Sequence, residues 1–585
     1  LGIGFTASAQ TIQRGDEDTL RNKVVQISTY VPTVTDAKKM SESPSTVDTV
    51  LTKMTVRYLH DNARFETSFT PDTIKAAKMK SEPLDPLYRA HAKAGAGNGI
   101  NYLADIYVNA LRSREGSLGF KANGFGTQGN LQEASVPAPY SHWNGEVFGK
   151  KFYKKHAVSG QVGYNRERVQ YYGYDDTNPY YFDISDDAFK QVYNDVYADV
   201  MLKSFYSDSS KLNHSFGAHY NIFNDLYGAN TEQNAVLKGN INTFFGNHQF
   251  DMDILGDFNT VNYKEAFTYF PFDSISDISN NFIANLHPKF ISQAKDFRVE
   301  VGLQLQAEIT GNGSSPYVYP NINAKYNLVK ELLIPYANIR GFFGRGVNRT
   351  NLNSLTRTNP FMWTSLTPLQ NEKEMYSISG GFRGAISNRF TYNVFGELKK
   401  TENVPLFINY NASQFNLGES KFGENLFLVN YDTVRVSELG GELTYRVNEK
   451  LQLLASGVYR SYQTSSEFEA WQLPNFELNA SGFYQIRNKI IVKGQFHLVG
   501  PRLSKSYDSN DDFVGYDKVN QQDVYSTSLP LIFDMTLGAE YRYTERLSGF
   551  INFHNLMAQK YQYWNQYPTQ RFNVMFGITC SFWKE

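Results

Sequence analysis

Apolar and polar residues alternate along most of this chain, and that alternation limits what the sequence can fold into. From Leu87 onward it runs in stretches of about ten to fifteen residues, and Phe297–Ala307 and Leu451–Arg460 show it clearly. A period of two points successive side chains to opposite faces, as in a β-strand with one apolar and one polar face. The sequence therefore predicts an all-β protein built from strands and their connections.

The composition favours strands and excludes membrane-spanning helices. Aromatic residues make up 15% of the chain, with 40 Tyr and 43 Phe, and there are 43 Gly against 20 Pro. Tyrosine- and phenylalanine-rich chains favour strands. Mean hydropathy is -0.46, and no apolar run approaches the roughly 18 residues that a membrane-spanning helix needs. A membrane-spanning barrel needs no such run, because only every second residue of each strand faces lipid.

The connections between the predicted strands alternate between short and long. The short polar turns are Asn247–Gln249, Lys330–Glu331, Ser387–Arg389, Asn448–Lys450, Asn488–Lys489 and Thr544–Arg546. The longer loops, rich in Tyr and Asp, cover about 128–140, 175–190, 264–279, 348–374, 402–433, 464–474 and 505–530. Outer-membrane barrels show this asymmetry, with tight turns in the periplasm and long loops outside the cell.

The strand count follows from these boundaries. The first strand is predicted at Leu87–Gly97, the second at Ile100–Arg112 and the last at Arg571–Trp583, which gives about 22 strands. An even number returns the end of the barrel to the side where it began. We therefore predict a single transmembrane antiparallel β-barrel over residues 87–585, located in the cell outer membrane of a Gram-negative bacterium and in contact with its lipid and lipopolysaccharide.

The residues before the barrel have a different character. Residues 1–9 end in Ala7-Ser8-Ala9, which matches the small-residue cleavage site of a secretory signal peptide, so we interpret them as a signal remnant. Residues 10–86 are rich in charged and hydroxyl side chains, with a strand-like run at Val24–Tyr30 and a short predicted helix at Ser68–Met79. We expect a periplasmic or luminal segment, either a plain linker or an element that packs into or under the barrel.

The final hairpin resembles the last two strands of TonB-dependent outer-membrane receptors. Those receptors carry an Asn-Leu, a Lys-Tyr soon after it, a Tyr-Pro in the last loop, and a Gly and a terminal aromatic in the last strand. The matching residues here are Asn555, Leu556, Lys560, Tyr561, Tyr567, Pro568, Gly577 and Phe582. The resemblance implies a barrel of roughly 22 strands, and the last strand resembles the signal by which the barrel-assembly machinery engages its substrates.

The resemblance does not extend to the N-terminal segment. TonB-dependent receptors place a folded plug domain before the barrel, and residues 10–86 are short for one and lack its glycine motifs. The chain is similar to receptor-like barrels of Bacteroidota without a full plug domain. Because a lumen of about 22 strands is wide enough to leak, we expect residues 10–86, inward-folded loops or a partner protein to occlude it.

Three loops offer candidate binding residues. The rings of Phe267, Tyr269, Phe270 and Phe272 could stack on a glycan or an aromatic ligand, although packing in the aromatic girdle is the plainer interpretation. One acidic loop holds Asp175, Asp176, Asp183, Asp186 and Asp187, and a second runs from Asp508 to Asp512 and on to Asp517. Clustered oxygen ligands suit Ca²⁺, which makes Asp508 and Asp512 weak candidates; we favour solvated loop charge for both loops.

Other function classes find little support. The formal net charge is -1, so no basic field favours nucleic acid. The ten histidines, among them His91, His142 and His554, show no spacing typical of a catalytic triad, and we predict no enzyme, catalytic residue or cofactor. Cys580 is the single cysteine and is interpreted as a small apolar residue of the last strand.

The sequence thus predicts a TonB-dependent-receptor-like barrel that binds a solute or passes it across the outer membrane. The alternative is a non-transporting barrel subunit in a larger outer-membrane complex, with residues 10–86 as a docking arm for periplasmic or surface partner proteins. Fold alone does not decide between the two.

Overall fold

The computed structural model describes residues 87–584 apart from short gaps. The gaps are 111–114, 129–130, 132–133, 135–136, 174–189, 208–210, 227, 247, 264–279, 312, 410–425, 449, 507–508, 510 and 518–521. The strand-like run Val24–Tyr30, the predicted helix Ser68–Met79, the aromatic loop 267–272 and the acidic loop 175–187 therefore lie outside the described residues.

Twenty-two strands pair side by side in one sheet. The first eleven are Tyr88–Gly97 (β1), Asn101–Asn109 (β2), Gly116–Thr127 (β3), Tyr140–Tyr153 (β4), His156–Gln170 (β5), Lys190–Ser204 (β6), Asn213–Asp225 (β7), Thr231–Phe245 (β8), His248–Asn262 (β9), Asn280–Gln293 (β10) and Phe297–Thr310 (β11). The others are Gly313–Tyr326 (β12), Ile334–Asn348 (β13), Glu372–Ser387 (β14), Phe390–Asn409 (β15), Phe427–Asn448 (β16), Leu451–Gln463 (β17), Phe476–Ile486 (β18), Ile490–Val499 (β19), Ile532–Arg542 (β23), Leu547–His554 (β24) and Asn573–Lys584 (β27).

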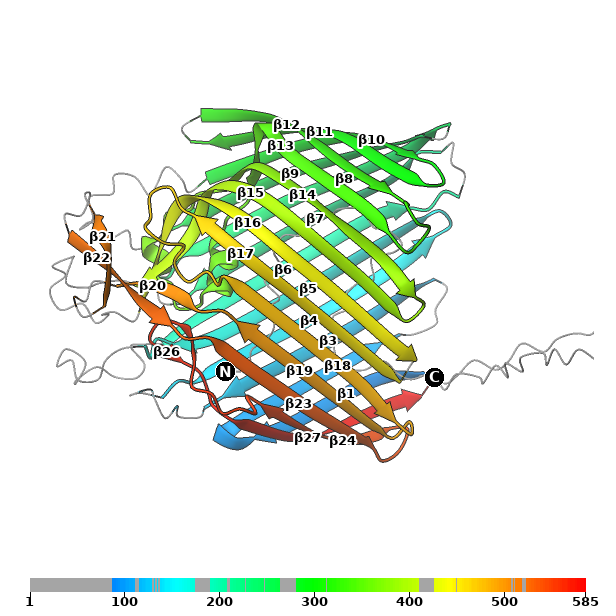
Figure 1. The fold of residues 1–585 in the computed structure, drawn as a ribbon. Helices are drawn as coiled ribbons and strands as arrows, with labels where there is room; N and C mark the ends of the chain where they lie inside the picture. The colour runs from blue at the N-terminus through cyan, green and yellow to red at the C-terminus, as the bar shows by residue number, and fades with distance from the viewer. Residues whose placement is uncertain are drawn as a thin grey trace, which may run out of the picture. The chain divides into compact units, whose positions relative to one another are not determined.

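The sheet closes on itself, because β27 pairs with β1 as well as with β24. Neighbouring strands run antiparallel, and Figure 1 shows them tilted across the wall of the barrel. The strand ends joined by the six predicted short turns lie at one end, here called the turn end, and the strand ends that flank the predicted long loops lie at the other, the loop end. The prediction of an all-β antiparallel barrel of about 22 strands is confirmed.

Each barrel strand presents an apolar face outward and a polar face inward. On β11 the side chains of Val301 and Leu303 are 51% and 44% exposed, while the flanking Glu300 and Gln304 are 7% and 6% exposed. This is the reverse of a water-soluble protein, in which exposed side chains are polar. It follows that the outside of the barrel faces lipid and the inside is the polar compartment.

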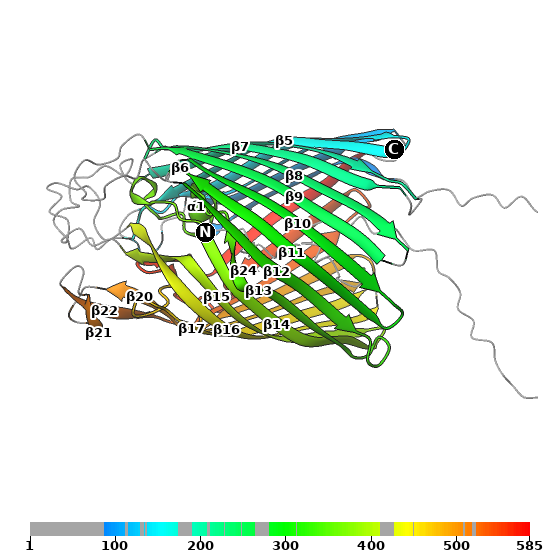
Figure 2. The same ribbon diagram turned by 90° about the horizontal axis from the view of Figure 1, so that it is seen from above.

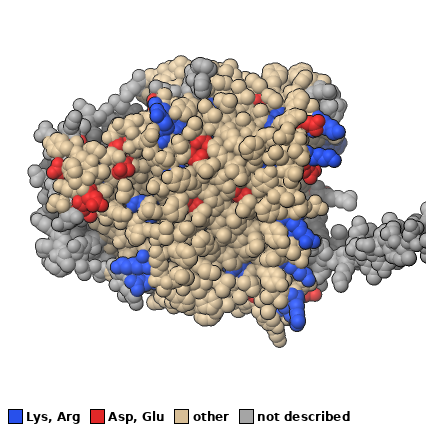
Figure 3. All heavy atoms as spheres, viewed as in Figure 1, with Lys and Arg blue, Asp and Glu red and all other residues tan. Residues whose placement is uncertain are grey.

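The exterior has the features of a bilayer-spanning surface. Tyr326, Tyr445 and Tyr541 are exposed at the turn-end limits of their strands, where aromatic side chains form a girdle at the membrane interface. In Figure 3 the outer face is mostly uncharged across its middle, and its Lys and Arg side chains lie mainly toward its two ends. A closed antiparallel barrel with an apolar exterior belongs in the cell outer membrane. Among the described residues, no helix has the length and apolarity to cross a membrane.

The seam between β27 and β1 depends on Gly577, one of the residues in the C-terminal signature. A Cβ atom at this position would overlap the backbone oxygen of Ala94 on β1 and the ring of Phe550 on β24. Cys580 also lies on β27 and is a free thiol. The signature glycine is therefore explained by close backbone approach where the last strand meets the first.

Two small sheets and two short helices lie in the connections at the loop end. Arg502–Ser506 (β20), Asp512–Asp517 (β21) and Gln522–Leu529 (β22) form a three-stranded sheet, visible at the left of Figure 1. Gln562–Trp564 (β25) pairs with Tyr567–Pro568 (β26) in the last loop. The α-helix Leu352–Thr358 (α1) and a 3-10 helix at Thr364–Leu366 lie in the connection between β13 and β14.

Candidate functional site

The connection between β13 and β14 folds into the barrel. Its residues 349–371 are here called the crossing segment, and in Figure 2 its helix α1 lies inside the ring of strands. The segment contacts luminal side chains on several strands, among them β6, β8 and β9. These contacts make it the candidate functional site of the described chain.

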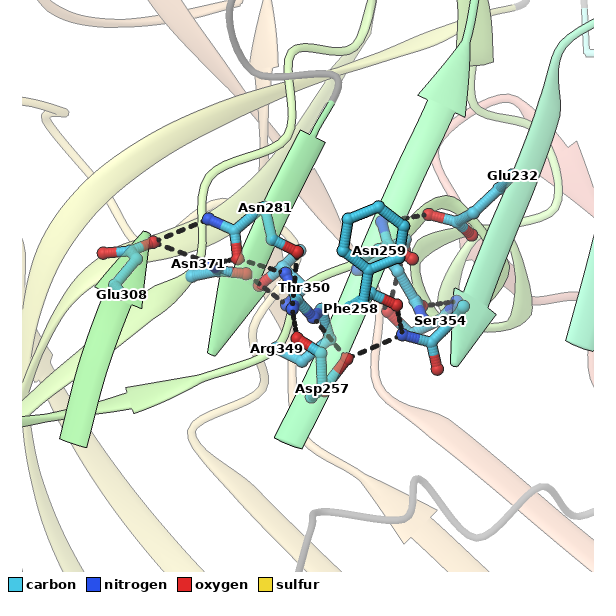
Figure 4. A network of polar contacts seen from close by, with 12 residues as sticks. Glu232, Asp257, Phe258, Asn259, Asn281, Glu308, Arg349, Thr350, Ser354 and Asn371 are labelled. Carbon is cyan, nitrogen blue, oxygen red and sulfur yellow. Dashed lines mark hydrogen bonds and ion pairs between the residues drawn. The ribbon is translucent and has the colours of Figure 1, made fainter. Parts of the chain in front are cut away.

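Arg349 anchors the start of the crossing segment to β9 and β10. Its Nε atom lies 3.1 Å from Oδ1 of Asp257 and its Nη2 donates to the Asp257 backbone oxygen at 2.8 Å. Its Nη1 donates to Oδ1 of Asn281, as Figure 4 shows. Burial lowers the pKa of the Arg349 guanidinium, and Asp257 opposes that shift, so the guanidinium remains charged at neutral pH.

Asn371, the last residue of the crossing segment, extends this network. Its Nδ2 donates to Oε1 of Glu308 on β11 at 2.8 Å, and its Oδ1 accepts from the backbone nitrogen of Thr350 at 3.0 Å. Asn281 also donates to Glu308, at 3.1 Å. Both ends of the segment are thereby tied to one patch of wall on β9, β10 and β11.

Glu232 on β8 holds the N-terminus of α1. Its two carboxylate oxygens accept from the backbone nitrogens of Leu352 at 3.0 Å and Asn353 at 2.9 Å, and the residue is fully buried. Asn351 and Ser354 add a reciprocal capping box. A carboxylate at a helix N-terminus satisfies amide groups that have no partner within the helix. The first backbone N–H groups of α1 therefore have acceptors although the helix lies inside the barrel.

Three further contacts attach the segment to β6, to the end of β7 and to the turn after it. Arg357 Nη2 lies 2.9 Å from Oδ2 of Asp195, which is 6% exposed. Thr364 Oγ1 donates to Asp225 at 2.8 Å, and Asn230 Nδ2 donates to Ser365 Oγ at 3.1 Å. Polar contacts thus continue along the lumen from β6 to β11, and we call this the charged wall.

The opposite side of the segment pairs with β16. The backbone nitrogen of Trp363 donates to the oxygen of Phe427 at 2.8 Å, and the nitrogen of Phe427 donates to the oxygen of Phe361 at 3.1 Å. Met362 forms a parallel bridge with Phe427. Strands β6 and β16 are ten places apart in a closed ring of 22, so they face each other. The segment consequently spans the lumen from wall to wall.

Aromatic rings pack where the segment reaches β16. Phe361 stacks on Tyr567 with ring centroids 3.6 Å apart, and Tyr172 meets both rings edge-on. The Tyr172 hydroxyl donates to the backbone oxygen of Pro568 at 3.0 Å, and burial raises its pKa. We call Tyr172, Phe361, Met362, Phe427 and Tyr567 the mouth cluster; each is at most 5% exposed.

A polar cavity of about 520 Å³ lies between α1 and the charged wall. Seven wall residues and four residues of the crossing segment line it, and all are polar. They are Asn165, Asp195, Tyr197, Asp199, His219, Asn221 and Asn234 from the wall and Asn351, Asn353, Ser354 and Arg357 from the segment.

The structure uses the C-terminal signature mainly to position the last loop. Asn555 adopts a left-handed backbone (φ 46°) and its amide donates to the Gln559 oxygen at 2.9 Å. Tyr561 donates to Asp534 at 2.7 Å, and burial raises its pKa. Tyr567 stacks on Phe361 of the crossing segment, and the backbone oxygen of Pro568 accepts from Tyr172. Leu556 is partly buried, Lys560 is exposed, and Phe582 lies beside Trp583 on β27.

Of the other predicted site residues, the structure describes Asp512 alone. Phe267, Tyr269, Phe270, Phe272 and Asp508 lie outside the described residues. Asp512 opens β21 and is exposed. Within the described parts of the chain, no group of three or more His, Cys, Asp or Glu side chains is placed to hold a metal.

Sequence reasoning placed a long loop at 348–374 but gave its residues no role. Two local signals were present: Asn351 and Ser354 at the spacing of a capping box, and the arginines at 349 and 357. The partners of those arginines lie about 90 and 160 residues away in sequence, so no local pattern reveals them.

Solved structures with similar folds are large outer-membrane receptors. The copper transporter OprC aligns with a TM-score of 0.58 and 13% identity, covering 85% of this chain and 81% of that one. The siderophore receptor PirA from Acinetobacter baumannii aligns with a TM-score of 0.63 and 9% identity, covering 86% and 81%. The FrpB iron transporter from Neisseria meningitidis aligns with a TM-score of 0.60 and 10% identity, covering 85% and 82%.

At these identities the likeness shows the fold. The structural neighbours are TonB-dependent outer-membrane receptors, the group that the last hairpin resembles in sequence. No protein-family model matches the sequence, and a comparison with curated proteins finds no match.

Proposed function

We propose that this protein takes up a solute through the outer membrane and that the crossing segment closes its lumen near the loop end. The observation that carries this proposal is the span of residues 349–371 from Asp195 on β6 to Phe427 on β16. The titles of the structural neighbours support an uptake role, since they name a copper transporter, a siderophore receptor and an iron transporter.

The crossing segment suits a gate because its attachments lie outside the strand ladder of the barrel: side-chain contacts at the charged wall, and two backbone hydrogen bonds with Phe427 at the start of β16. A barrel of 22 strands encloses a lumen too wide to be left open, and transporters of this size are plugged. The strand hydrogen bonds of β13 end at Asn348 and those of β14 begin at Glu372, so the segment between them can leave the lumen without breaking the sheet. The ion pairs of Arg349 and Arg357 and the mouth cluster are the contacts that hold it in place.

Residues 10–86 enter the proposal as the periplasmic or luminal segment before β1. We propose that they take the place of a full plug domain, as in receptor-like barrels of Bacteroidota, and that residues 1–9 are removed on export. Insertion by the barrel-assembly machinery and contact with lipopolysaccharide follow from the outer-membrane location. The alternative, a non-transporting subunit of a larger complex, is not favoured by the neighbours.

The test is ion conductance of the full chain in planar bilayers. The double variant Arg349→Met/Arg357→Gln removes the two arginines by which the crossing segment pairs with the charged wall, and we expect large, long-lived openings that the unmodified protein lacks. The matched control is Lys289→Met, which removes a luminal cation 3.0 Å from Asp253 but outside the segment; its conductance should stay low.

Two results would count against the gate. The first is a high conductance in the unmodified protein. The second is a double variant that stays closed until residues 10–80 are also deleted, because the N-terminal segment would then be the element that closes the lumen.

A further inference from the structure

The connection between β4 and β5 concentrates positive charge at the turn end of the barrel. Residues 150–155 contain no acidic residue and four lysines, which are Lys150, Lys151, Lys154 and Lys155. At other turns an acid stands beside the base, as at Lys295–Asp296, Lys330–Glu331 and Glu545–Arg546. Lys154 and Lys155 form the two-residue connection itself, and both are exposed. This turn therefore carries a charge that its own sequence does not balance.

The connection between β6 and β7 adds Lys211 to this charge. The exposed lysines of the two connections and the strand end beside them are here called the basic patch, which comprises Lys151, Lys154, Lys155 and Lys211. Among the described residues none of these lysines forms an ion pair, whereas Lys121 in the lumen lies 3.1 Å from Glu146. The one acid of the two connections, Asp208, lies outside the described residues. Exposed ammonium groups without a carboxylate partner attract anions from outside the chain.

Aromatic and imidazole rings cover the barrel surface beside the basic patch. The ring centroid of His156 lies 5.7 Å from that of Tyr206 and 5.4 Å from that of His214. The centroids of His214 and Phe216 lie 5.7 Å apart. The Nζ atom of Lys211 lies 5.7 Å from the centroid of Tyr206, within the range of a cation–π contact. His156, Tyr206, His214 and Phe216 therefore form one continuous surface, here called the ring platform, with Lys211 against it.

The strand register places the ring platform and Lys151 on the lipid side of the barrel. Strands β5, β6 and β7 lie side by side in its wall (Figure 2). Lys151 pairs with Val158 on β5. Val158 pairs with Leu202 on β6, which pairs with Phe216 on β7. Directly paired residues share a face of the sheet, and Val158 and Phe216 are 37% and 46% exposed. Because short turns of outer-membrane barrels face the periplasm, the basic patch lies at the headgroups of the periplasmic leaflet.

We propose that the basic patch and the ring platform bind an anionic glycerophospholipid of the periplasmic leaflet. The lysines supply the charge that a phosphate group requires. Rings at the level of the headgroups suit the boundary between polar and apolar parts of a lipid, and Val158 and Leu202 offer an apolar surface to its acyl chains. A water-soluble phosphate would use the lysines and leave the rest of this surface uncovered. The site is independent of the gate, because it lies at the turn end and the crossing segment lies near the loop end.

The test is native mass spectrometry of the full chain in detergent micelles, with one probe added at a time. The probes are dioleoyl-phosphatidylglycerol, dioleoyl-phosphatidylcholine and glycerol 3-phosphate. The two lipids have the same acyl chains and differ in net charge, and glycerol phosphate is a headgroup without chains. We expect phosphatidylglycerol to bind about tenfold more tightly than phosphatidylcholine and glycerol phosphate not to bind. The variant Lys151→Gln/Lys154→Gln/Lys155→Gln/Lys211→Gln should lose most of the preference for phosphatidylglycerol.

The matched control is Lys295→Gln/Lys330→Gln/Lys450→Gln/Lys489→Gln. It removes the same charge from exposed lysines at other turns of the same end, and its affinity for phosphatidylglycerol should equal that of the unmodified protein. Four results would overturn the proposal: equal affinity of the unmodified protein for both lipids, binding of glycerol phosphate as tight as that of phosphatidylglycerol, unchanged affinity in the variant of the basic patch, or an equal loss in both variants.

Discussion

The two attachments of the crossing segment differ in chemistry. Against the charged wall, Arg349 and Glu232 hold it through charged and directional hydrogen bonds. At β16, Phe361 and Tyr567 hold it through stacked rings. Directional contacts fix the register of a segment, and apolar packing depends on area more than on direction. The charged wall therefore sets where the segment sits, and the mouth cluster adds adhesion.

The two ends should therefore fail differently. A buried ion pair stabilises only while it is complete, because removing one partner leaves the other charge buried and unpaired. Loss of a ring leaves a cavity whose cost depends on how far its neighbours relax. The four predictions that follow separate these cases, and each is measured as amide hydrogen exchange of residues 350–371 in lipid nanodiscs.

Arg349→Met should have the largest effect. It leaves Asp257 buried without its cation, and we expect the docked segment to lose about 3–5 kcal/mol. Protection of α1 should fall accordingly. The double variant Arg349→Met/Asp257→Asn should recover part of the loss, since it also removes the unpaired charge. If the single variant exchanges as slowly as the unmodified protein, the charged wall does not fix the segment.

Phe361→Ala should cost about 3 kcal/mol through the lost ring packing against Tyr567 and Tyr172. We expect faster exchange at residues 360–366 while the start of α1 stays protected by Glu232. Phe361→Leu should recover much of the loss. Equal deprotection of both ends would show that the two attachments form one cooperative unit. That result would contradict separate roles for the charged wall and the mouth cluster.

Glu232→Gln should cost about 1–3 kcal/mol. The substitution keeps the shape but turns one acceptor oxygen into an NH2 donor, so that the backbone N–H of Leu352 or of Asn353 loses its acceptor and both lose a charged partner. Exchange should rise in the first turn of α1. Asn259→Leu, which removes the side-chain donor to Glu232 without adding a charge, serves as the comparison, and a greater effect there would contradict the capping role.

Arg357→Gln should have the smallest effect. The Arg357 side chain is 51% exposed, and ion pairs at exposed positions contribute about 0–1 kcal/mol. Exchange of α1 should change little, and the small change should vanish at high salt. A loss as large as that of Arg349→Met would show that the ion pair to Asp195 is a principal attachment.

The barrel could be predicted from the sequence because its rules are local. Alternation along Phe297–Ala307 marks β11, and charged turns such as Asn448–Lys450 mark the strand ends. Boundaries near the loop end were less accurate: the predicted loop 402–433 is shorter, since β15 continues to Asn409 and β16 begins at Phe427. Those strand ends carry buried residues on both faces, among them Leu406 and Phe407, so the alternation fades there.

The crossing segment could not be predicted in the same way. Its helix has seven residues, too few for a periodic pattern, and its stability comes from Glu232 and Asp195 on distant strands. Tyr567 was singled out as part of a C-terminal signature, yet its contact with Phe361 joins residues 206 positions apart. Contacts of that kind depend on closure of the barrel. The sequence pattern predicts the barrel itself but not which side chains meet across its lumen.

The most direct measurement of the central claim is conductance with the segment locked. In a Cys580→Ala background, Asn230→Cys/Ser365→Cys places two thiols on residues whose Nδ2 and Oγ atoms now lie 3.1 Å apart, and Arg349→Met/Arg357→Gln is added to loosen the other attachments. The account predicts a closed barrel when the disulfide is formed and large openings after reduction. Equal conductance before and after reduction would contradict it.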